Sequence, residues 1–441
     1  MAASAASGNR RHIRRVSSGA MIAFQPARIP GFLLVLLLAA CTSVPAPRAA
    51  GPAPTPYTLL LVSLDGVHPD DLARGDTPNL ARLAEEGVQA EWMTPSYPAL
   101  TFPNHYTLVT GLRPDRHGLV HNVMHTPELG RFTLSDRDAV GDGRWWEGGE
   151  PLWVTAENAG MPTATLFWPG SEAPVRGVQP TRWNRFDADL PLAERVDRVL
   201  GWLSEPADTR PRLATLYFEH PDSAGHRHGP GSPELRETMR AVDAQIGRLV
   251  DGIERGGLAG SVDVVIVSDH GMARVPEGNV VAFEEMVDEA DAEPVTFGQV
   301  VGFRPLPGHE AAAESALLGA HERYDCWRKQ ELPARWHYGS HPRIPPIVCQ
   351  MHEGWDAIPA RFIQRRPAGT RGSHGYDPAL PSMRAIFIAS GPSFASGVRL
   401  QAFDNVDVYP LLARLLGVDP ADHDGNAGTL LPALRQAPPT P

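Results

Sequence analysis

The sequence predicts an α/β fold, a three-layer α/β/α sandwich with a mostly parallel central sheet. The first observation is a set of short, continuously apolar runs, which are typical of strands buried on both faces of a sheet. The second is that helical patterns lie between several of these runs. The predicted strands are Thr58–Leu64, Thr163–Trp168, Leu213–Phe218, Val262–Ser268 and Ala385–Ala389.

The predicted helices have recognisable ends. Asp76-Thr77-Pro78 predicts a helix start, because proline is tolerated at the first helical position, and Gly87 predicts its end. Residues 233–253 form the longest helical pattern, and residues 407–416 form the last one. Ligands of such a sheet should gather outside the carboxyl ends of its strands.

Length and charge narrow the classes of function. A chain of 441 residues is long enough for one large domain or two smaller ones, and we expect the main domain to span residues 57–430. The net charge of -11 excludes a general basic surface for nucleic acid. A soluble acidic enzyme and a carboxylate-rich metal site both fit this charge, and the sequence does not specify an oligomeric state.

The first 41 residues have the features of an export signal. Arg10, Arg11, Arg14 and Arg15 precede a short apolar run, Phe32–Ala40. This run ends in Leu-Ala-Ala-Cys41, which resembles the lipobox of bacterial lipoproteins, so we expect cleavage before Cys41 and lipidation of its thiol. The chain is then exported, periplasmic and membrane-anchored; an ordinary cleaved signal is the alternative, and Met21 is an alternative start. Residues 42–56, rich in Pro and Ala, predict an extended tether.

Residues 290–370 differ from the rest in composition, with many Pro, Trp and His residues. They predict an inserted subdomain or lid between strands of the main sheet. This segment also holds Cys326 and Cys349, and two cysteines in one region are expected to pair in an oxidising compartment. The sequence does not establish that their geometry allows the bond.

Thr101 is the first candidate for chemistry. It stands just before a predicted short helix, with Pro103 in the first turn. The free N–H groups of such a helix start favour an anion. A threonine before such a turn is most often only an N-cap, so Thr101 becomes a nucleophile candidate only if the chain supplies metal ligands that activate it.

Acidic and imidazole side chains at several separate places supply such ligands. Asp222 and His226 can converge on one ion if their segment is helical, and His228 is the closest alternative to His226. The full set is Asp65, Asp222, His226, Asp269, His270 and His374. Three carboxylates and three imidazoles suit zinc, and they are too many for one tetrahedral ion. Two ions about 4 Å apart can hold the entering and leaving oxygens of a phosphoryl displacement. Asn122 would donate a hydrogen bond to a non-bridging phosphate oxygen, unless it is only a turn residue.

These segments together resemble the nucleotide pyrophosphatase/phosphodiesterase family of the alkaline phosphatase superfamily. We expect this chain to be a bacterial member of that family. They occur in family order over residues 57–420. The resemblance implies an alkaline-phosphatase-like fold with a small inserted subdomain. The matching segments are Asp65-Gly66, Thr101–His105, Thr110–Leu112, His117–Asn122, Phe167–Ser171, Pro221–His226, Ser268–Met272 and Gly372–Gly375.

The resemblance also implies roles for individual residues. One zinc ion would be held by Asp222, His226 and His374, and the other by Asp65, Thr101, Asp269 and His270. Thr101 would be the nucleophile, Asn122 would contact the phosphate, and a nucleotide base would stack on Phe102 and Tyr217, with Trp168 a weaker candidate. The implied activity is hydrolysis of phosphodiester or pyrophosphate bonds of nucleotides through a covalent threonine intermediate, which releases nucleoside 5′-monophosphates.

Other activities on the same fold remain open. A choline- or glycero-phosphodiesterase would need a cage for its ligand, which Glu128 or Trp145-Trp146-Glu147 would supply. A phosphomonoesterase would need an arginine beside the nucleophile, and only Arg113 and Arg116 are near in sequence. The sulfatase pattern requires an arginine that is absent after Pro103. A non-catalytic surface module is disfavoured because the expected metal ligands are all present.

Overall fold

A computed structural model describes residues 57–366 and 368–435 of the chain. The predicted signal segment, Cys41 and the 42–56 tether lie outside the described residues. Among the helices of the described part, none is both long enough and apolar enough to cross a membrane.

The main sheet has eight strands in the order β20-β2-β19-β9-β1-β8-β6-β7. Its pairings are parallel except those of β19, which runs antiparallel to both of its neighbours, so the sheet is mostly parallel as predicted. The bounds of these strands are β1 Thr58–Leu64, β2 Val88–Ala90, β6 Thr163–Leu166, β7 Arg182–Asn184, β8 Leu213–Phe218, β9 Val262–Val267, β19 Phe387–Ser390 and β20 Val398–Leu400.

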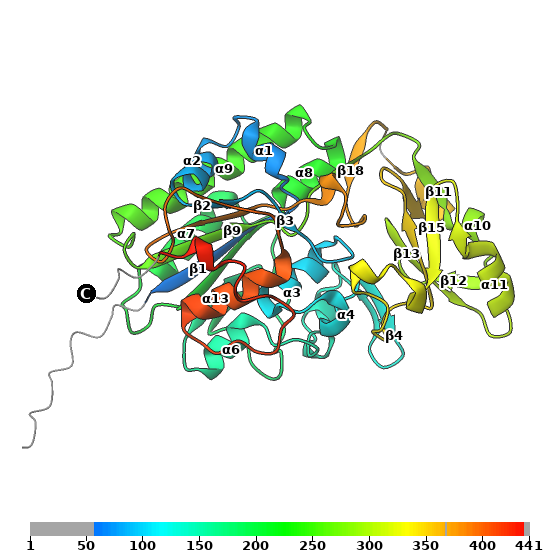
Figure 1. Cartoon of the computed structure of the whole chain (residues 1–441), viewed down its shortest axis with the longest axis horizontal. Coiled ribbons are helices and arrows are strands. Elements are labelled where there is room, and N and C mark those ends of the chain that lie inside the picture. The colour runs from blue at the N-terminus through cyan, green and yellow to red at the C-terminus, as the bar shows by residue number, and fades with distance from the viewer. Residues whose placement is uncertain (1–56, 367, 436–441) are drawn as a thin grey trace, which may run out of the picture. The chain divides into compact units, whose positions relative to one another are not determined.

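Helices cover both faces of this sheet (Figure 1). Alternate residues of β1 enter two different hydrophobic clusters, Leu60 and Val62 on one face and Leu59 and Leu61 on the other, which explains why the strand is apolar throughout. The first face packs against α1 Pro69–Ala73, α2 Pro78–Glu86, α7 Leu192–Leu203 and α9 Pro233–Arg255. The second packs against α3 Thr101–Thr110, α6 Leu152–Asn158 and α13 Val408–Leu416.

The structure corrects the predicted position of Thr101 by one residue. Leu100 has the extended backbone of an N-cap, with φ -119° and ψ 153°, and Thr101 is the first residue of α3. Thr101 therefore does not cap the helix with its side chain, and its hydroxyl is free for other contacts. The other predicted elements agree within two residues at each end, and β1 and β8 have the predicted bounds.

A second, antiparallel sheet lies within residues 290–370, with strand order β12-β13-β16-β15-β14. Cys326 and Cys349 are direct partners in the register of β15 and β16, and they form a disulfide. The strands are β12 Ala292–Pro294, β13 Val300–Pro305, β14 Gly319–Ala320, β15 Tyr324–Arg328 and β16 Ile347–Met351, with α11 Glu310–Leu317 beside them.

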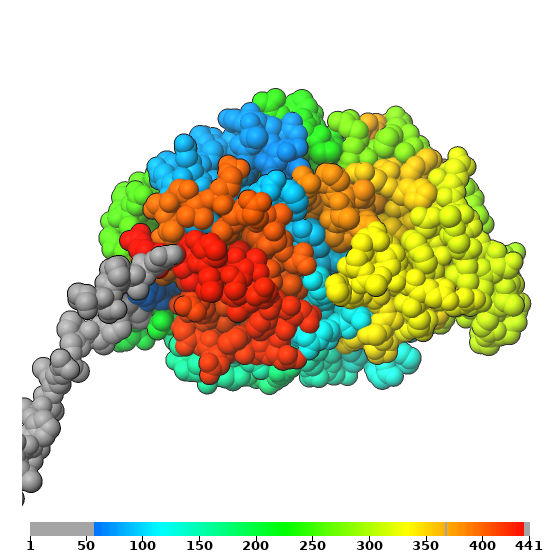
Figure 2. All heavy atoms as spheres, viewed as in Figure 1, coloured from blue at the N-terminus to red at the C-terminus, as the bar shows by residue number. Residues whose placement is uncertain are grey.

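The segment that follows β15 is tied to the part of the chain that carries Thr101. Trp336 stacks on Tyr97 with ring centroids 4.0 Å apart, and the Tyr338 hydroxyl donates to the Val120 carbonyl at 3.0 Å. Asp115 accepts hydrogen bonds from the backbone of residues 339–341. On the face drawn in Figure 2, the orange and red residues of α13 and the chain after it form part of the surface.

Short elements complete the described chain. The helices are α4 Pro114–His117, α5 Arg137–Val140, α8 His220–His228, α10 Phe283–Met286 and α12 Ala360–Ile363. The strands are β3 Met93–Thr94, β4 Val123–Thr126, β5 Gly130–Thr133, β10 Ala273–Val275, β11 Val280–Ala282, β17 Asp356–Ile358, β18 Arg371–Ser373 and β21 Phe403–Asp404.

Candidate active site

The predicted ligands meet at the carboxyl ends of three neighbouring strands of the main sheet. Asp65 follows β1 directly, Asp269 follows β9 after one residue, and Asp222 lies in α8, which begins just after β8. Because β1 lies between β8 and β9 and runs parallel to both, these three carboxylates are brought to the same edge of the sheet.

One group of three side chains, here called the His226 cluster, consists of Asp222, His226 and His374. The Nε2 atoms of the two histidines are 3.0 Å apart, and each lies 3.4 Å from Asp222 Oδ1. The helical turn of α8 places Asp222 and His226 on one side, as their spacing predicted. A tetrahedral ion with bonds of about 2.1 Å holds its donors about 3.4 Å apart, so the three atoms fit a shared metal ion.

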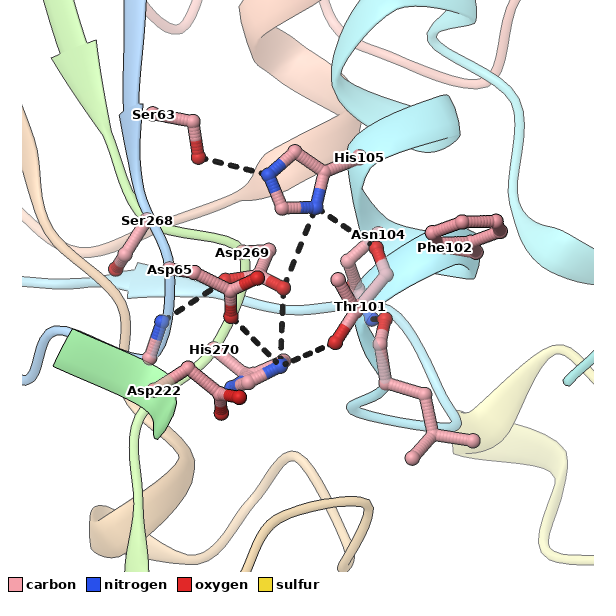
Figure 3. A network of polar contacts seen from close by, with 12 residues as sticks. Ser63, Asp65, Thr101, Phe102, Asn104, His105, Asp222, Ser268, Asp269 and His270 are labelled. Carbon is pink, nitrogen blue, oxygen red and sulfur yellow. Dashed lines mark hydrogen bonds and ion pairs between the residues drawn. The ribbon is translucent and has the colours of Figure 1, made fainter. Parts of the chain in front are cut away.

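The second group, here called the Thr101 cluster, consists of Asp65, Asp269, His270 and Thr101 (Figure 3). His270 Nε2 lies 2.9 Å from Asp269 Oδ2, 3.6 Å from Asp65 Oδ1 and 3.4 Å from Thr101 Oγ1. Asp65, Asp269 and His270 are at most 1% exposed. The structure therefore brings the seven residues for which metal ligation was predicted close together. The two predicted groups adjoin each other, because His270 also lies near Asp222 and stacks on His374 with ring centroids 3.5 Å apart.

Backbone carbonyls fix the orientation of the three histidines. The Nδ1 atoms of His226, His270 and His374 lie 2.9–3.0 Å from the carbonyls of Gly372, Gly271 and Ala99. A carbonyl can only accept, so each Nδ1 carries a proton, and in the neutral ring each Nε2 presents its lone pair. Such backbone partners are typical of metal-ligating histidines.

The polar atoms that remain without partners point to positive charge. One buried oxygen of each carboxylate, in Asp65, Asp222 and Asp269, has no hydrogen-bond partner. Burial, and after it repulsion from Asp269 and Asp222, raises the pKa of Asp65 well above its usual range. Burial likewise raises the pKa of Asp222. Divalent cations would satisfy these oxygens and remove the repulsion, so the residues present fit metal ions.

The nucleophile candidate and the phosphate-binding candidate are connected at the start of α3. Asn122 Oδ1 accepts a hydrogen bond from the Phe102 backbone N–H at 3.0 Å. This bond uses the amide oxygen of Asn122, and it leaves the amide NH2 group as a donor. Asn122 is thus held beside Thr101, which lies next to Phe102 in the chain.

The aromatic candidates pack in separate groups. Phe102 contacts Phe132 and Trp146 with ring centroids 5.9 and 5.8 Å apart. Tyr217 contacts Phe186, a half-buried ring at 6.2 Å, and its hydroxyl donates to Asp65 Oδ2. That hydrogen bond gives Tyr217 a contact with a candidate metal ligand that the sequence did not suggest.

Trp168 belongs to the core. It is 1% exposed, and its indole N–H donates to the His105 carbonyl at 3.1 Å. This burial agrees with the structural interpretation of Trp168 and not with a place in a base-stacking slot.

The tryptophans and arginines that the alternative activities would need are buried or already paired. Trp145 and Trp146 are at most 1% exposed, so they cannot line an open cage for a quaternary ammonium. Arg113 pairs with Asp404 at 2.8 Å, and Arg116 pairs with Asp424 at 2.5 Å. Both arginines are therefore engaged with carboxylates of the C-terminal segment.

His105 is a residue whose role the sequence did not reveal. It lies fully buried in α3, one turn after Thr101, and its Nδ1 is 3.3 Å from Asp269 Oδ2. Its spacing of four residues from Thr101 was visible in the sequence. Its contact with Asp269 depends on how α3 packs on the sheet, and no local pattern predicts that.

Comparisons with known proteins agree with this site. The sequence model of the family described as type I phosphodiesterase / nucleotide pyrophosphatase matches residues 59–377. An uncharacterized pyrophosphatase/phosphodiesterase of Schizosaccharomyces pombe is 37% identical over 396 residues, which are 86% of this chain and 80% of the relative. Human ectonucleotide pyrophosphatase/phosphodiesterase family member 7 is 35% identical over 416 residues, 91% of this chain and 89% of the relative.

A solved structure shares the fold. Murine ectonucleotide pyrophosphatase/phosphodiesterase 5, as an inactive variant in complex with AMP, superposes with a TM-score of 0.81 and 31% identity, covering 86% of this chain and 100% of that one. The relatives named here are eukaryotic, so the bacterial source of this chain stays a prediction. The chain belongs to the type I phosphodiesterase/nucleotide pyrophosphatase family, with its alkaline-phosphatase-like fold, and it is a phosphodiesterase.

Proposed function

We propose that this phosphodiesterase is a two-zinc hydrolase that cleaves phosphodiester or pyrophosphate bonds of nucleotides through a covalent threonine intermediate. The observation that carries the proposal is the position of Thr101 Oγ1, 3.4 Å from the Nε2 lone pair of His270 and at the positive end of α3. A hydroxyl that lies beside an imidazole nitrogen and two buried carboxylates is placed to bind a cation together with them, and to act as a nucleophile.

The donor atoms indicate which metal the two clusters would hold. Imidazole nitrogens mixed with carboxylate oxygens suit zinc better than magnesium or calcium, which prefer oxygen ligands. The His226 cluster would hold one ion, and the Thr101 cluster would hold the other. When bound, the ions would lower the pKa of the Thr101 hydroxyl and stabilise negative charge on the phosphate oxygens.

The chain's own residues then account for a two-step reaction. Thr101 Oγ1 gives up its proton and attacks phosphorus, the Oγ1–P bond forms, the bond to the leaving group breaks, and the leaving group takes up a proton. The amide NH2 group of Asn122 donates to a non-bridging phosphate oxygen. In the second step a water oxygen attacks phosphorus, the Oγ1–P bond breaks, and Thr101 regains its proton, with net retention at phosphorus.

The relatives support this proposal for the nucleophile and the product. The murine structure named above is an inactive variant in which alanine replaces a threonine, and it contains AMP. A nucleoside monophosphate is the product expected from a nucleotide diester. Phe102 follows Thr101 in the chain and donates its backbone N–H to Asn122, and the Tyr217 hydroxyl donates to Asp65. Because both rings are therefore close to the Thr101 cluster, we propose that they border the base.

Three nitrophenyl esters test the substrate class with zinc-loaded protein. They are the ester of a nucleoside 5′-monophosphate, of phosphocholine and of simple phosphate. We expect strong preference for the nucleotide ester. Preference for the phosphocholine ester would keep Thr101 and the zinc pair but overturn the role of Phe102 and Tyr217. Preference for simple phosphate would contradict the substrate class.

We also propose that the protein is exported to an oxidising compartment and anchored through a lipid on Cys41. The lipobox-like sequence before Cys41 and the Cys326–Cys349 disulfide support this proposal. Cell fractionation tests it: the wild-type protein should partition with membranes, and a Cys41→Ser variant should not. Membrane association of the variant, or a wild-type protein without lipid by mass spectrometry, would contradict it.

A further inference from the structure

We propose that His105 is a positioning residue of the Thr101 cluster: its Nδ1–H donates to the backbone of the nucleophile and faces Asp269, and the ring does not bind metal. This inference rests on the proposed function. His105 lies within reach of Asp65 and Asp269, so its distance from them alone would make it a candidate third ligand. The hydrogen bonds of its ring decide between the two roles.

The ring of His105 is fixed at both nitrogens (Figure 3). Nδ1 lies 2.9 Å from the Thr101 carbonyl, one helical turn back. That carbonyl can only accept, so Nδ1 carries a proton. Nε2 lies 2.8 Å from the Ser63 hydroxyl, which donates to it in the neutral ring.

The proton on Nδ1 determines what Asp269 meets. Asp269 Oδ2 lies 3.3 Å from this same Nδ1, so it faces an N–H and not a lone pair. The three histidines assigned as ligands also point their Nδ1 protons to backbone carbonyls, but they face the carboxylates with Nε2 and not with Nδ1. His105 therefore lacks a nitrogen that is free to coordinate an ion beside Asp269.

A second donor holds the other carboxylate of the cluster in the same way. The Tyr217 hydroxyl donates to Asp65 Oδ2, and the Tyr217 ring packs edge-on against the His105 ring with centroids 5.1 Å apart. Ser63 and Tyr217 are direct partners in the register of β1 and β8. Tyr217 thus holds Asp65 at Oδ2, and His105 approaches Asp269 at Oδ2, while the Gly66 N–H donates to Asp269 Oδ1 at 3.2 Å. The Tyr217 and His105 rings pack against each other.

Two substitutions of His105 separate the donor role from packing. His105→Asn keeps an N–H near the position of Nδ1, whereas His105→Gln places its amide near the position of Nε2 and loses the Nδ1 donor. We expect the asparagine variant to retain most of kcat. We expect the glutamine variant to lose roughly 10–100-fold in kcat and in affinity for zinc, which is typical of lost partners of metal ligands, with KM little changed.

Zinc titration by calorimetry gives a readout that does not depend on the substrate. Both variants should still bind two ions at saturation. Loss of one ion in both variants would identify His105 as a ligand and overturn the inference. Equal losses of kcat in the two variants, or wild-type kcat and zinc affinity in both, would also overturn it. If wild-type protein binds two ions but turns over none of the esters, the proposed function fails while this test still stands.

Ser63→Ala provides a second route if neither variant folds. It removes only the hydroxyl that orients the His105 ring, and it leaves the Nδ1 donor in place. We expect a loss of a few fold in zinc affinity at an unchanged melting temperature, and unchanged zinc affinity would contradict the inference.

Discussion

The His226 cluster and the Thr101 cluster are made of the same residue types but differ in their access to solvent. The His226 side chain is 40% exposed, whereas the side chains of His270 and Asp269 are 0% exposed. The buried cluster also contains the nucleophile candidate. This difference suggests a division of roles, in which the Thr101 cluster activates the attacking hydroxyl and the His226 cluster meets water and the leaving group.

The largest expected effect is on the nucleophile of the buried cluster. Thr101→Ala should reduce kcat roughly a thousandfold or more, because no other hydroxyl lies at that position, and zinc content should remain largely intact. Thr101→Ser is the matched control, since it keeps the hydroxyl and should retain part of the activity. Turnover by the alanine variant at the wild-type rate would exclude Thr101 as the nucleophile.

Removing one histidine from each cluster tests the division directly. His270→Ala should cost more in kcat than His226→Ala, because His270 Nε2 contacts both carboxylates and Thr101. We expect losses of roughly a thousandfold and a hundredfold, with the bound zinc of the His226 variant falling to one ion per chain.

His228→Ala is the control for these variants, because His228 lies in α8 two residues after His226. It should keep both ions and full activity. A His228 variant that loses an ion, alongside a His226 variant that loses none, would mean that the cluster is wrongly assigned.

Asn122 is hydrogen-bonded to the helix that carries the nucleophile candidate, and its contact with phosphate is a proposal. Asn122→Asp keeps an oxygen that accepts from the Phe102 N–H, but it removes the amide donor, so kcat should fall roughly a hundredfold while the melting temperature stays close to that of the wild type. Asn122→Ala removes both contacts and should lower kcat similarly. If these variants unfold, Asn122 is a structural residue and its proposed contact with phosphate is unsupported.

The smallest expected effect is on stability, and its sign follows from the raised carboxylate pKa values. In metal-stripped protein, burial raises the pKa of Asp65 and Asp222 above their values in the unfolded chain. Ionisation of these two carboxyl groups therefore lowers the free energy of unfolding as the pH rises through their pKa values in the folded protein. Bound zinc removes that cost, so the rise in melting temperature on adding zinc should be larger at pH 8 than at pH 5.5.

Differential scanning fluorimetry of chelator-treated protein, with and without zinc, measures this rise. The pKa of Asp269 has little influence in this window. Although burial alone would raise the pKa of Asp269, the neighbouring His270 ring, protonated in metal-stripped protein, holds it well below its usual range. A rise in melting temperature that is equal at the two pH values, or larger at pH 5.5, would contradict the account.

The strand-end rule explains why the carboxylates of both clusters were predictable. Asp65 and Asp269 follow buried apolar runs, and parallel strands bring such residues to one edge whatever the rest of the chain does. His226 followed from its helical spacing to Asp222. In these cases a local pattern and one general rule of topology are sufficient.

The contacts behind the ligands were not predictable, because they join elements that are distant in the sequence. His105 is held by Ser63 of β1 and Asp269 at the end of β9, and the Tyr217 hydroxyl reaches Asp65 from the neighbouring strand β8. The attachment of Trp336 to Tyr97 likewise depends on how residues 290–370 pack. Such contacts are set by tertiary packing, which leaves no periodic signal in the sequence.

The number of metal ions bound per chain tests the central claim most directly, and native mass spectrometry of zinc-loaded wild-type protein measures it. The presence of two clusters predicts two zinc ions per chain. A single ion at saturation would mean that the seven side chains form one site, and no bound ion would contradict the metal-dependent mechanism altogether.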